Sequence, residues 1–409
     1  MFEKFKEKNY KKDDEFELSI KLDDYVLFPC CKIKGKIEFK RKKDNIEFEK
    51  EKKKEFKIKY KLTQFMKYEY EYEGILGSKG DYKNDPNKRI IFETELYQIC
   101  PKNFKEESFS LDLDDIFLPG EEIKDFYPTF EYREDKIYLF IRHLLTIEIP
   151  ELKTMNSTGI IICKLPKQNI EKNFKIIYDD FTWNYFLKKK GKISYEFRIQ
   201  KLIYSLNEEI PVTLAINTED LKNVEIDSIE IFLQKKIKIK GLVNLKFWKE
   251  NDGEKIVKLS TKKYSGDEVK KKKLNFSEKL QIESDELPEF AKNEYDKENI
   301  PKYSKKEIEK YTKFDSNFLE KENHNVQRKD LNPSIDSEDF LCEYKVKFVI
   351  KFNSKTMLDE SDEFVIDLYT LKPSFIDKCI QSYFKTKESS SFIFGDEIDL
   401  DKKNEKNQV

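Results

Sequence analysis

The stretch KISYEFRIQKLIYSLNEEIPVTLAINTEDLKNVEIDSIEIFLQKK, residues 192–236, is where the pattern that decides the fold is clearest. Apolar and polar residues alternate from Ile193 to Ile199, and this period of two places successive side chains on opposite faces of a β-strand. The same alternation recurs in four other segments: 33–39, 56–62, 237–247 and 344–352. Because no amphipathic helix of about 10–15 residues separates them, the pattern predicts antiparallel β-sandwiches rather than a parallel α/β sheet.

Length and composition indicate the number of domains and exclude one class of partner. A chain of 409 residues is long enough for two domains of about 150–200 residues each. Its 79 Lys and Arg residues are balanced by 80 Asp and Glu residues, so no global field favours binding to nucleic acid. Aromatic residues make up 14% of the chain and supply core volume, although only 38% of the residues are hydrophobic.

Residues that could perform catalysis or hold a metal are scarce. The two histidines are His143 and His324, and the cysteines at 30, 31, 100, 163, 342 and 379 form no CxxC pair. None of the 11 glycines stands in the order of a phosphate-binding loop. We therefore predict that the chain is not an enzyme and holds no cofactor or metal.

The sequence also carries signals for the cellular compartment. It starts with the charged stretch MFEKFKEKNYKK instead of an apolar signal segment, and its cysteines lack disulfide-like spacing. No run of about 18 apolar residues occurs. These features predict a cytoplasmic protein whose membrane association, at the plasma membrane or endosomes, is at most peripheral.

Two segments in the first half resemble the N-terminal domain of arrestins. The segment FELSIKLDDYVLFPCCKIKGKIEFK, residues 16–40, is similar to the turn and strand that open an arrestin domain, although Cys30 and Cys31 stand where that family favours Gly-Glu. The later segments 127–131 and 137–141 are similar to the family's Pro-Pro-Ser-Phe-Glu segment and its Ile-x-Tyr strand. In the opening segment the matching residues are Tyr25, Pro29, Ile33, Gly35 and Ile37.

The second half resembles the arrestin C-terminal domain. Residues 192–236 are similar to its strand, Tyr-turn, strand, Asn, strand and Leu-Gln ending, and the segments 342–352 and 363–371 match its closing strands. The resemblance is carried by Tyr204, Asn207, Glu208, Ile210, Asn217, Val224, Ile229, Leu233 and Gln234. It implies two tandem immunoglobulin-like sandwiches of the arrestin-related trafficking adaptor type, although the PPxY motifs that recruit ubiquitin ligases in many such adaptors are missing.

The resemblance and the composition together predict the domain organisation. An N-terminal sandwich is expected at 14–172 and a C-terminal sandwich at 188–372. Within the second, the polar segment 249–336 is interpreted as a flexible, solvated insertion that is dispensable for folding, because it has few apolar residues and many charges. Residues 373–409 are expected to form a regulatory tail that begins with a short amphipathic helix at 373–386.

Candidate site residues fall near the two ends of the chain. Lys11, Lys12, Lys378 and Lys385 are candidate contacts for phosphate or lipid, because several lysines together attract phosphate groups. The first two also stand near the place of a lysine pair that engages receptor phosphates in arrestins. Candidate residues for docking of the tail onto the body are Phe375, Ile376, Ile380, Phe384, Phe392 and Phe394.

The function that the resemblance implies is that of a non-enzymatic adaptor. Such a scaffold binds the cytoplasmic tails of membrane proteins and links them to trafficking or signalling proteins, with strand addition as a mode of peptide binding. Two alternatives stay open. One is a retromer-type subunit of an endosomal sorting coat, and the other is a structural protein built from β-sandwiches.

Overall fold

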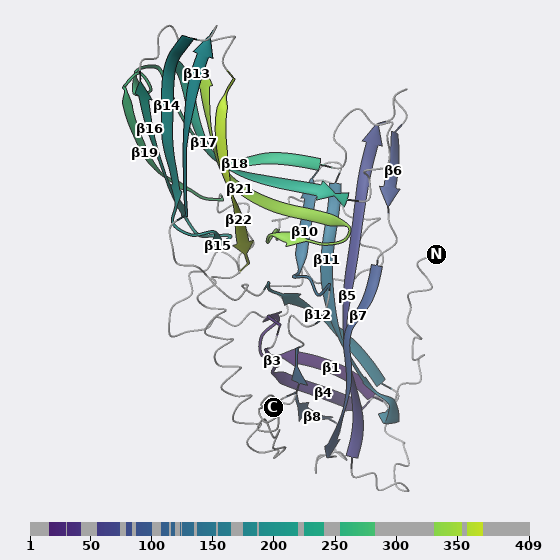
Figure 1. The fold of residues 1–409 in the computed structure, drawn as a ribbon. Coiled ribbons are helices and arrows are strands. Elements are labelled where there is room, and N and C mark those ends of the chain that lie inside the picture. Colours follow the sequence, from purple (N-terminus) through teal and green to yellow (C-terminus); the bar gives the residue numbers. More distant parts are fainter. Residues whose placement is uncertain are drawn as a thin grey trace, which may run out of the picture.

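The computed structural model describes residues 16–41, 55–164, 175–282 and 331–370, apart from gaps at 30, 74–78, 84–86, 100–107, 114–115, 119–122, 124, 135–136, 153, 186–187, 220–224, 241–253 and 354–357. Its strands form two sandwich-like bodies, which confirms the predicted all-β class (Figure 1). We call residues 16–164 the N-terminal body and residues 175–370 the C-terminal body. Among the described residues, no helix is long and apolar enough to cross a membrane.

The N-terminal body contains two main sheets and a small two-stranded one. The first sheet has the order β1 (Phe16–Leu22), β4 (Gly35–Arg41) and β8 (Ser108–Asp112). The second has the order β2 (Val26–Leu27), β12 (Thr154–Ile162), β11 (Ile137–Ile149), β5 (Glu55–Glu73) and β6 (Lys79–Lys83), with β10 (Phe130–Glu134) on β11 and β7 (Asn87–Ile99) on β5. The small sheet pairs β3 (Lys32–Ile33) with β9 (Ile116–Phe117). A 3-10 turn at Pro150–Leu152 follows β11.

The C-terminal body contains two sheets. The first has the order β13 (Lys175–Tyr185), β14 (Lys188–Ile199), β16 (Ile210–Glu219) and β19 (Lys273–Leu280). The second has the order β15 (Ile203–Ser205), β22 (Glu360–Tyr369), β21 (Phe340–Phe352), β17 (Ile226–Ile239) and β18 (Glu254–Ser265), with β20 (Ile335–Asp336) on β21. A 3-10 turn at Gly266–Glu268 joins β18 to β19.

The cores follow from the alternation in the sequence. Every second residue of β21 is buried, beginning with Phe340, and the residues between them are lysines, glutamates or other half-buried side chains. On the inner face Phe348 packs edge to face on Tyr195 and Phe197, with ring centroids 4.9 Å apart in both pairs. Such aromatic pairs bury large areas, which explains how a chain of low hydrophobic content builds two cores.

A tyrosine closes the same kind of turn in each body. The hydroxyl of Tyr25 accepts a hydrogen bond from the N–H of Leu22 at 3.2 Å, and that of Tyr204 accepts one from the N–H of Lys201 at 3.3 Å. The short strand that begins near each tyrosine pairs in parallel, β2 with β12 and β15 with β22. Each half of the sequence therefore contains the same tyrosine-closed turn and short parallel strand, as the resemblance predicted.

The interpretation of 249–336 as a dispensable insertion is wrong for its two ends. β18 and β19 lie within it and pair with β17 and β16 over their whole lengths. Residues 331–336 are also part of the fold, since Leu331 is fully buried and β20 pairs with β21. The lysines of β18 and β19 lie largely on exposed positions, while buried residues such as Leu274 and Phe276 supply the inner face. Residues 283–330 lie outside the described residues.

The C-terminal body also begins earlier than predicted. β13 starts at Lys175 and pairs with β14 along its length, from the pair Lys175 and Ile199 to the pair Tyr185 and Lys188. The exposed Asp179 and Asp180 interrupt the apolar pattern of this strand in the sequence. The expected helix at 373–386 and the tail at 373–409 lie outside the described residues.

Candidate binding edges

The candidate site residues that the sequence offered all lie outside the described residues. This holds for Lys11, Lys12, Lys378, Lys385, Phe375, Ile376, Ile380, Phe384, Phe392 and Phe394. A binding site must therefore be sought on the described surface. In a sandwich protein that surface includes strand edges, whose unpaired N–H and C=O groups can accept another strand.

The outer edge of β1 is already occupied by side chains. The amide of Asn156, in β12, donates a hydrogen bond to the carbonyl oxygen of Leu18 at 2.6 Å. The hydroxyl of Tyr25 lies 3.4 Å from the carbonyl oxygen of Ile20 and accepts from the N–H of Leu22. Because these groups point away from β4, an added strand would first have to displace Asn156 and Tyr25.

The outer edge of β18 is protected by lysines. Glu230 on the neighbouring strand β17 is surrounded by Lys258 at 2.7 Å, Lys351 at 3.4 Å and Lys263 at 3.9 Å. The hydrogen bond from Lys258 is the largest cause of the lowered pKa of Glu230. The pairing of β17 with β18 also shifts register after Leu233. Lysines and bulges discourage edge-to-edge pairing, so this edge is poorly suited to strand addition.

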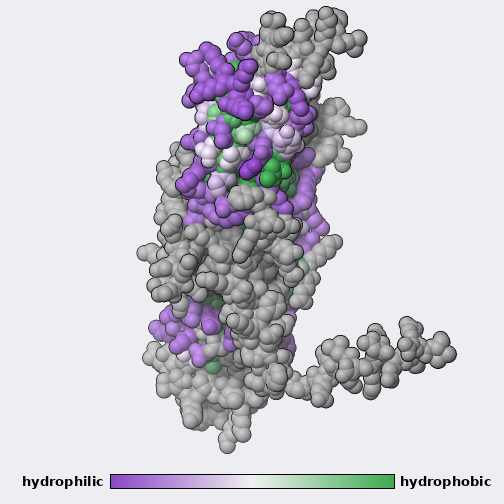
Figure 2. All heavy atoms as spheres, turned by 60° about the vertical axis from the view of Figure 1, so that its left-hand side comes forward, coloured by the Kyte–Doolittle hydropathy of each residue, from purple (hydrophilic) through white to green (hydrophobic). Residues whose placement is uncertain are grey.

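The edge strand β13 has apolar side chains at exposed positions. It pairs with β14 on one side, and within the described ranges no strand pairs with its other side. Ile177 and Phe181 pack against the core. On the other face of the strand, Ile176 is 52% exposed and Tyr178 is 69% exposed. Figure 2 shows one face of the C-terminal body, which is mainly hydrophilic or neutral with smaller apolar areas.

Carboxylates gather along the same edge. Asp179 lies opposite Tyr195 in the register of β13 and β14, and the hydroxyl of Tyr195 donates to Asp362, in β22, at 3.0 Å. Burial, and then the carboxylates of Asp179 and Asp362, raise the pKa of the nearby Glu360. Asp180 is balanced by Lys192 at 2.6 Å. The edge formed by β13 and the start of β22, which we call the acidic edge, therefore carries more negative charge than its own lysines neutralise.

The buried polar groups of the N-terminal body have structural partners. His143, in β11, lies 2.9 Å from the hydroxyl of Thr129 and 3.3 Å from the side-chain oxygen of Gln64. That oxygen also accepts from the N–H of Tyr127. Burial lowers the pKa of His143 to about 3, so the imidazole is neutral and holds the segment before β10. Groups of three metal-ligating side chains are absent from the described part of the chain.

Sequence reasoning missed the acidic edge. The segment KIIYDDFTWNY of β13 does not alternate strictly, and Asp179 and Asp180 interrupt it. The local signal was the apolar run from Ile176 to Tyr178, which directly precedes the two aspartates. The charge of the edge could not be read locally, because Glu360 and Asp362 come from a strand that is distant in the sequence.

Comparison with known proteins gives one match. Residues 189–373 match the family model described as the arrestin (or S-antigen) C-terminal domain. No curated protein matches the chain. The matched range runs from β14 past the end of β22, so it spans nearly the whole C-terminal body, and the tyrosine turn of the N-terminal body repeats that of the matched domain. The chain therefore forms two sandwich-like bodies, consistent with the arrestin fold, and its second body matches the arrestin C-terminal domain.

Proposed function

We propose that this protein is a non-enzymatic adaptor that binds cytoplasmic tails of membrane proteins and links them to trafficking or signalling machinery. The arrestin fold is consistent with such a role. The observation that carries the proposal is the acidic edge. It combines a strand without a partner on one side in the described structure, two exposed apolar side chains and an excess of carboxylates.

The chemistry of this edge fits an extended, basic peptide. Main-chain hydrogen bonds to β13 would give affinity, and alternate side chains of the peptide would meet Ile176 and Tyr178. Lysines and arginines of the peptide would meet Asp179 and Glu360. Cytoplasmic segments near a membrane are enriched in lysine and arginine, so the tails of membrane proteins supply peptides of this composition.

Fluorescence anisotropy with a labelled peptide of about 12 residues, alternating lysine with valine or leucine, tests the proposal. The double variant Tyr178→Lys, Asp179→Lys should raise Kd at least about tenfold, because it removes an apolar contact and reverses one charge. Raising NaCl from about 50 mM to about 500 mM should also weaken binding, since the charges are exposed.

The matched control is Ile256→Lys. This residue is 54% exposed on β18, so its replacement changes an apolar side chain to lysine on an edge that we do not assign to peptide binding. Equal losses in both variants would mean that any added positive charge repels the peptide, and unchanged binding in the double variant would exclude the acidic edge as the site.

A further inference from the structure

The two bodies meet through residues 331–340, which we call the junction segment. Its attachment to the C-terminal body is extensive. The N–H of Ser334 donates to the carbonyl oxygen of Leu368 at 2.9 Å, and the Ser334 hydroxyl accepts from the N–H of Leu368 at 2.8 Å. The hydroxyl of Tyr344 donates to the carbonyl oxygen of Asn332 at 2.7 Å. The junction segment is therefore a fixed part of the C-terminal body.

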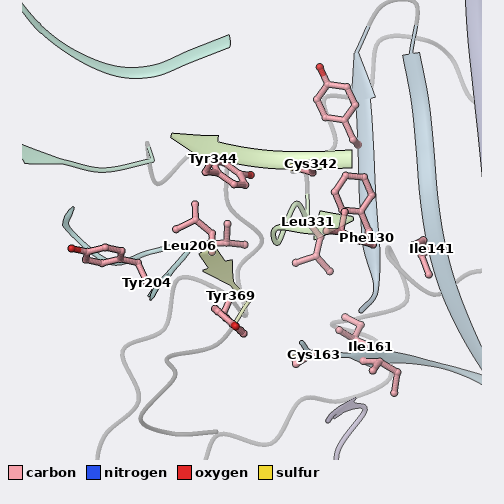
Figure 3. Packing of buried hydrophobic residues seen from close by; sticks show 14 of the residues in the cluster. Phe130, Ile141, Ile161, Cys163, Tyr204, Leu206, Leu331, Cys342, Tyr344 and Tyr369 are labelled. Atoms are coloured by element: carbon pink, nitrogen blue, oxygen red, sulfur yellow. The ribbon is translucent and has the colours of Figure 1, made fainter. Parts of the chain in front are cut away.

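On its other side the junction segment extends a sheet of the N-terminal body. Leu331 and Glu131 exchange two backbone hydrogen bonds, of 2.9 and 3.1 Å, in the antiparallel pattern. Since β10 also pairs with β11, Glu131 lies between two strand partners, one from each body. Figure 3 shows Leu331 beside Phe130, and the rings of Phe130 and Phe340 lie 5.1 Å apart.

The strand that receives Leu331 is held by a buried ion pair. The guanidinium of Arg142, in β11, donates to the carboxylate of Glu131 at 3.0 Å, and each side chain is only 3% exposed. The same nitrogen of Arg142 lies 2.9 Å from the hydroxyl of Tyr138. The pair joins two residues of the same body. It fixes β10 on β11, and so it fixes the edge to which Leu331 binds.

Further contacts join the bodies outside this strand pair. Lys235, in β17, is buried and lies over the buried ring of Tyr132 at 4.9 Å. Lys164 forms an ion pair with Asp367 at 2.6 Å, with side chains 20% and 29% exposed. Exposed pairs of this kind contribute little and are screened by salt, whereas buried backbone hydrogen bonds and packed rings are not.

We propose that the junction segment is a latch that sets one orientation of the two bodies, and that the pair of Glu131 and Leu331 is its closing contact. The bodies separate only when this pair opens, as a single event, because the segment is fixed to one body and β10 to the other. The latch does not depend on salt, and the ion pair of Lys164 and Asp367 is dispensable for it. This inference is independent of the peptide-binding proposal.

Distance measurements between the bodies in the full chain test the latch. Spin labels attached through unnatural amino acids at positions 97 and 262, both exposed, report on the N-terminal and C-terminal bodies respectively. We expect one narrow distance distribution that is unchanged between about 50 mM and about 500 mM NaCl. Leu331→Pro removes the N–H that donates to the carbonyl oxygen of Glu131, so it should broaden or shift the distance distribution. Lys164→Ala should leave it as it is.

The latch is overturned if Leu331→Pro gives the same distance distribution as the native chain while both bodies stay folded. It is also overturned if Lys164→Ala or added salt broadens the distribution as much as Leu331→Pro does. A measurement without any variant covers the case in which Leu331→Pro fails to fold. The amides of Glu131 and Leu331 should show similar hydrogen-exchange protection and lose it at the same denaturant concentration. Rapid exchange at Leu331 beside strong protection at Glu131 would show that the pair does not hold the bodies together.

Discussion

His143 and Thr129 face each other inside the N-terminal body, with the imidazole Nδ1 2.9 Å from the hydroxyl oxygen. Burial holds the pKa of His143 at about 3, well below its ordinary value of 6.5. The neutral ring therefore belongs to the folded state, and any condition that protonates it opposes folding.

The first prediction concerns the pH dependence of stability. Between pH 6.5 and 3 the unfolded chain takes up a proton at His143 that the folded chain cannot, so the free energy of unfolding falls with pH by up to about 1.4 kcal/mol per pH unit. At pH 5 the loss from this residue is about 2 kcal/mol. Urea unfolding at pH 5, 6 and 7 measures this loss. In His143→Gln the free energy of unfolding should depend less on pH between 5 and 7. An unchanged slope in the variant would assign the pH dependence to other groups.

The second prediction concerns Gly35, one of the residues that carry the arrestin resemblance. Its φ is +156°, and a Cβ atom there would lie 2.3 Å from the carbonyl oxygen of Lys21 and 2.8 Å from the Cα atom of Leu22. Gly35→Ala should therefore force β1 and β4 apart and lower the free energy of unfolding by about 2–4 kcal/mol. Thermal melting of the purified variant measures this loss.

Gly266 provides the control for Gly35. Its φ is +61°, but a Cβ atom there would meet nothing within 4 Å. Gly266→Ala should cost only the backbone penalty of a left-handed residue, about 1 kcal/mol. Equal losses for the two variants would show that backbone conformation, and not the contact with Lys21, makes glycine necessary at position 35.

The third prediction concerns the ion pair of Glu131 and Arg142. Glu131→Ala leaves a buried guanidinium without its carboxylate and should cost about 3–5 kcal/mol. The double variant Glu131→Leu, Arg142→Met removes both charges and should recover part of this loss. A thermodynamic cycle over Glu131→Leu, Arg142→Met and their double variant gives the coupling energy.

Lys21→Ala, which breaks the exposed pair with Glu38, is the control and should cost less than about 1 kcal/mol. Additive losses would show that the buried pair is not coupled.

The fourth prediction concerns the protease resistance of residues 254–282, the part of the expected insertion that forms β18 and β19. Residues 254–282 carry many lysines, but their backbone is paired in β18 and β19, so trypsin should cut there late despite the many sites. Intact-mass measurement of early fragments locates the first cuts. Early cleavage after Lys258, Lys262 or Lys279 would contradict the strand pairing.

Comparison of particular elements explains what the sequence could and could not predict. Strands with strict alternation, such as β21, were predicted because buried residues such as Phe348 and half-buried lysines such as Lys347 alternate with the period of the pleat. β18 and β19 were missed because edge strands bury only part of one face, so exposed lysines such as Lys262 stand among apolar residues such as Leu259 and Phe276. The junction segment was missed because the burial of Leu331 depends on Glu131, to which no local pattern points.

The pairing of Glu131 with Leu331 has a consequence for how the chain is made. The two residues are about 200 positions apart, so at about 5–20 residues per second a ribosome takes roughly 10–40 s to deliver the second after the first. During that interval the nascent N-terminal half exposes the edge of β10 and the ring of Phe130, a surface that invites aggregation. Chaperone recognition of ribosome-bound intermediates would therefore concentrate on this edge, and would end when Leu331 emerges and pairs with it.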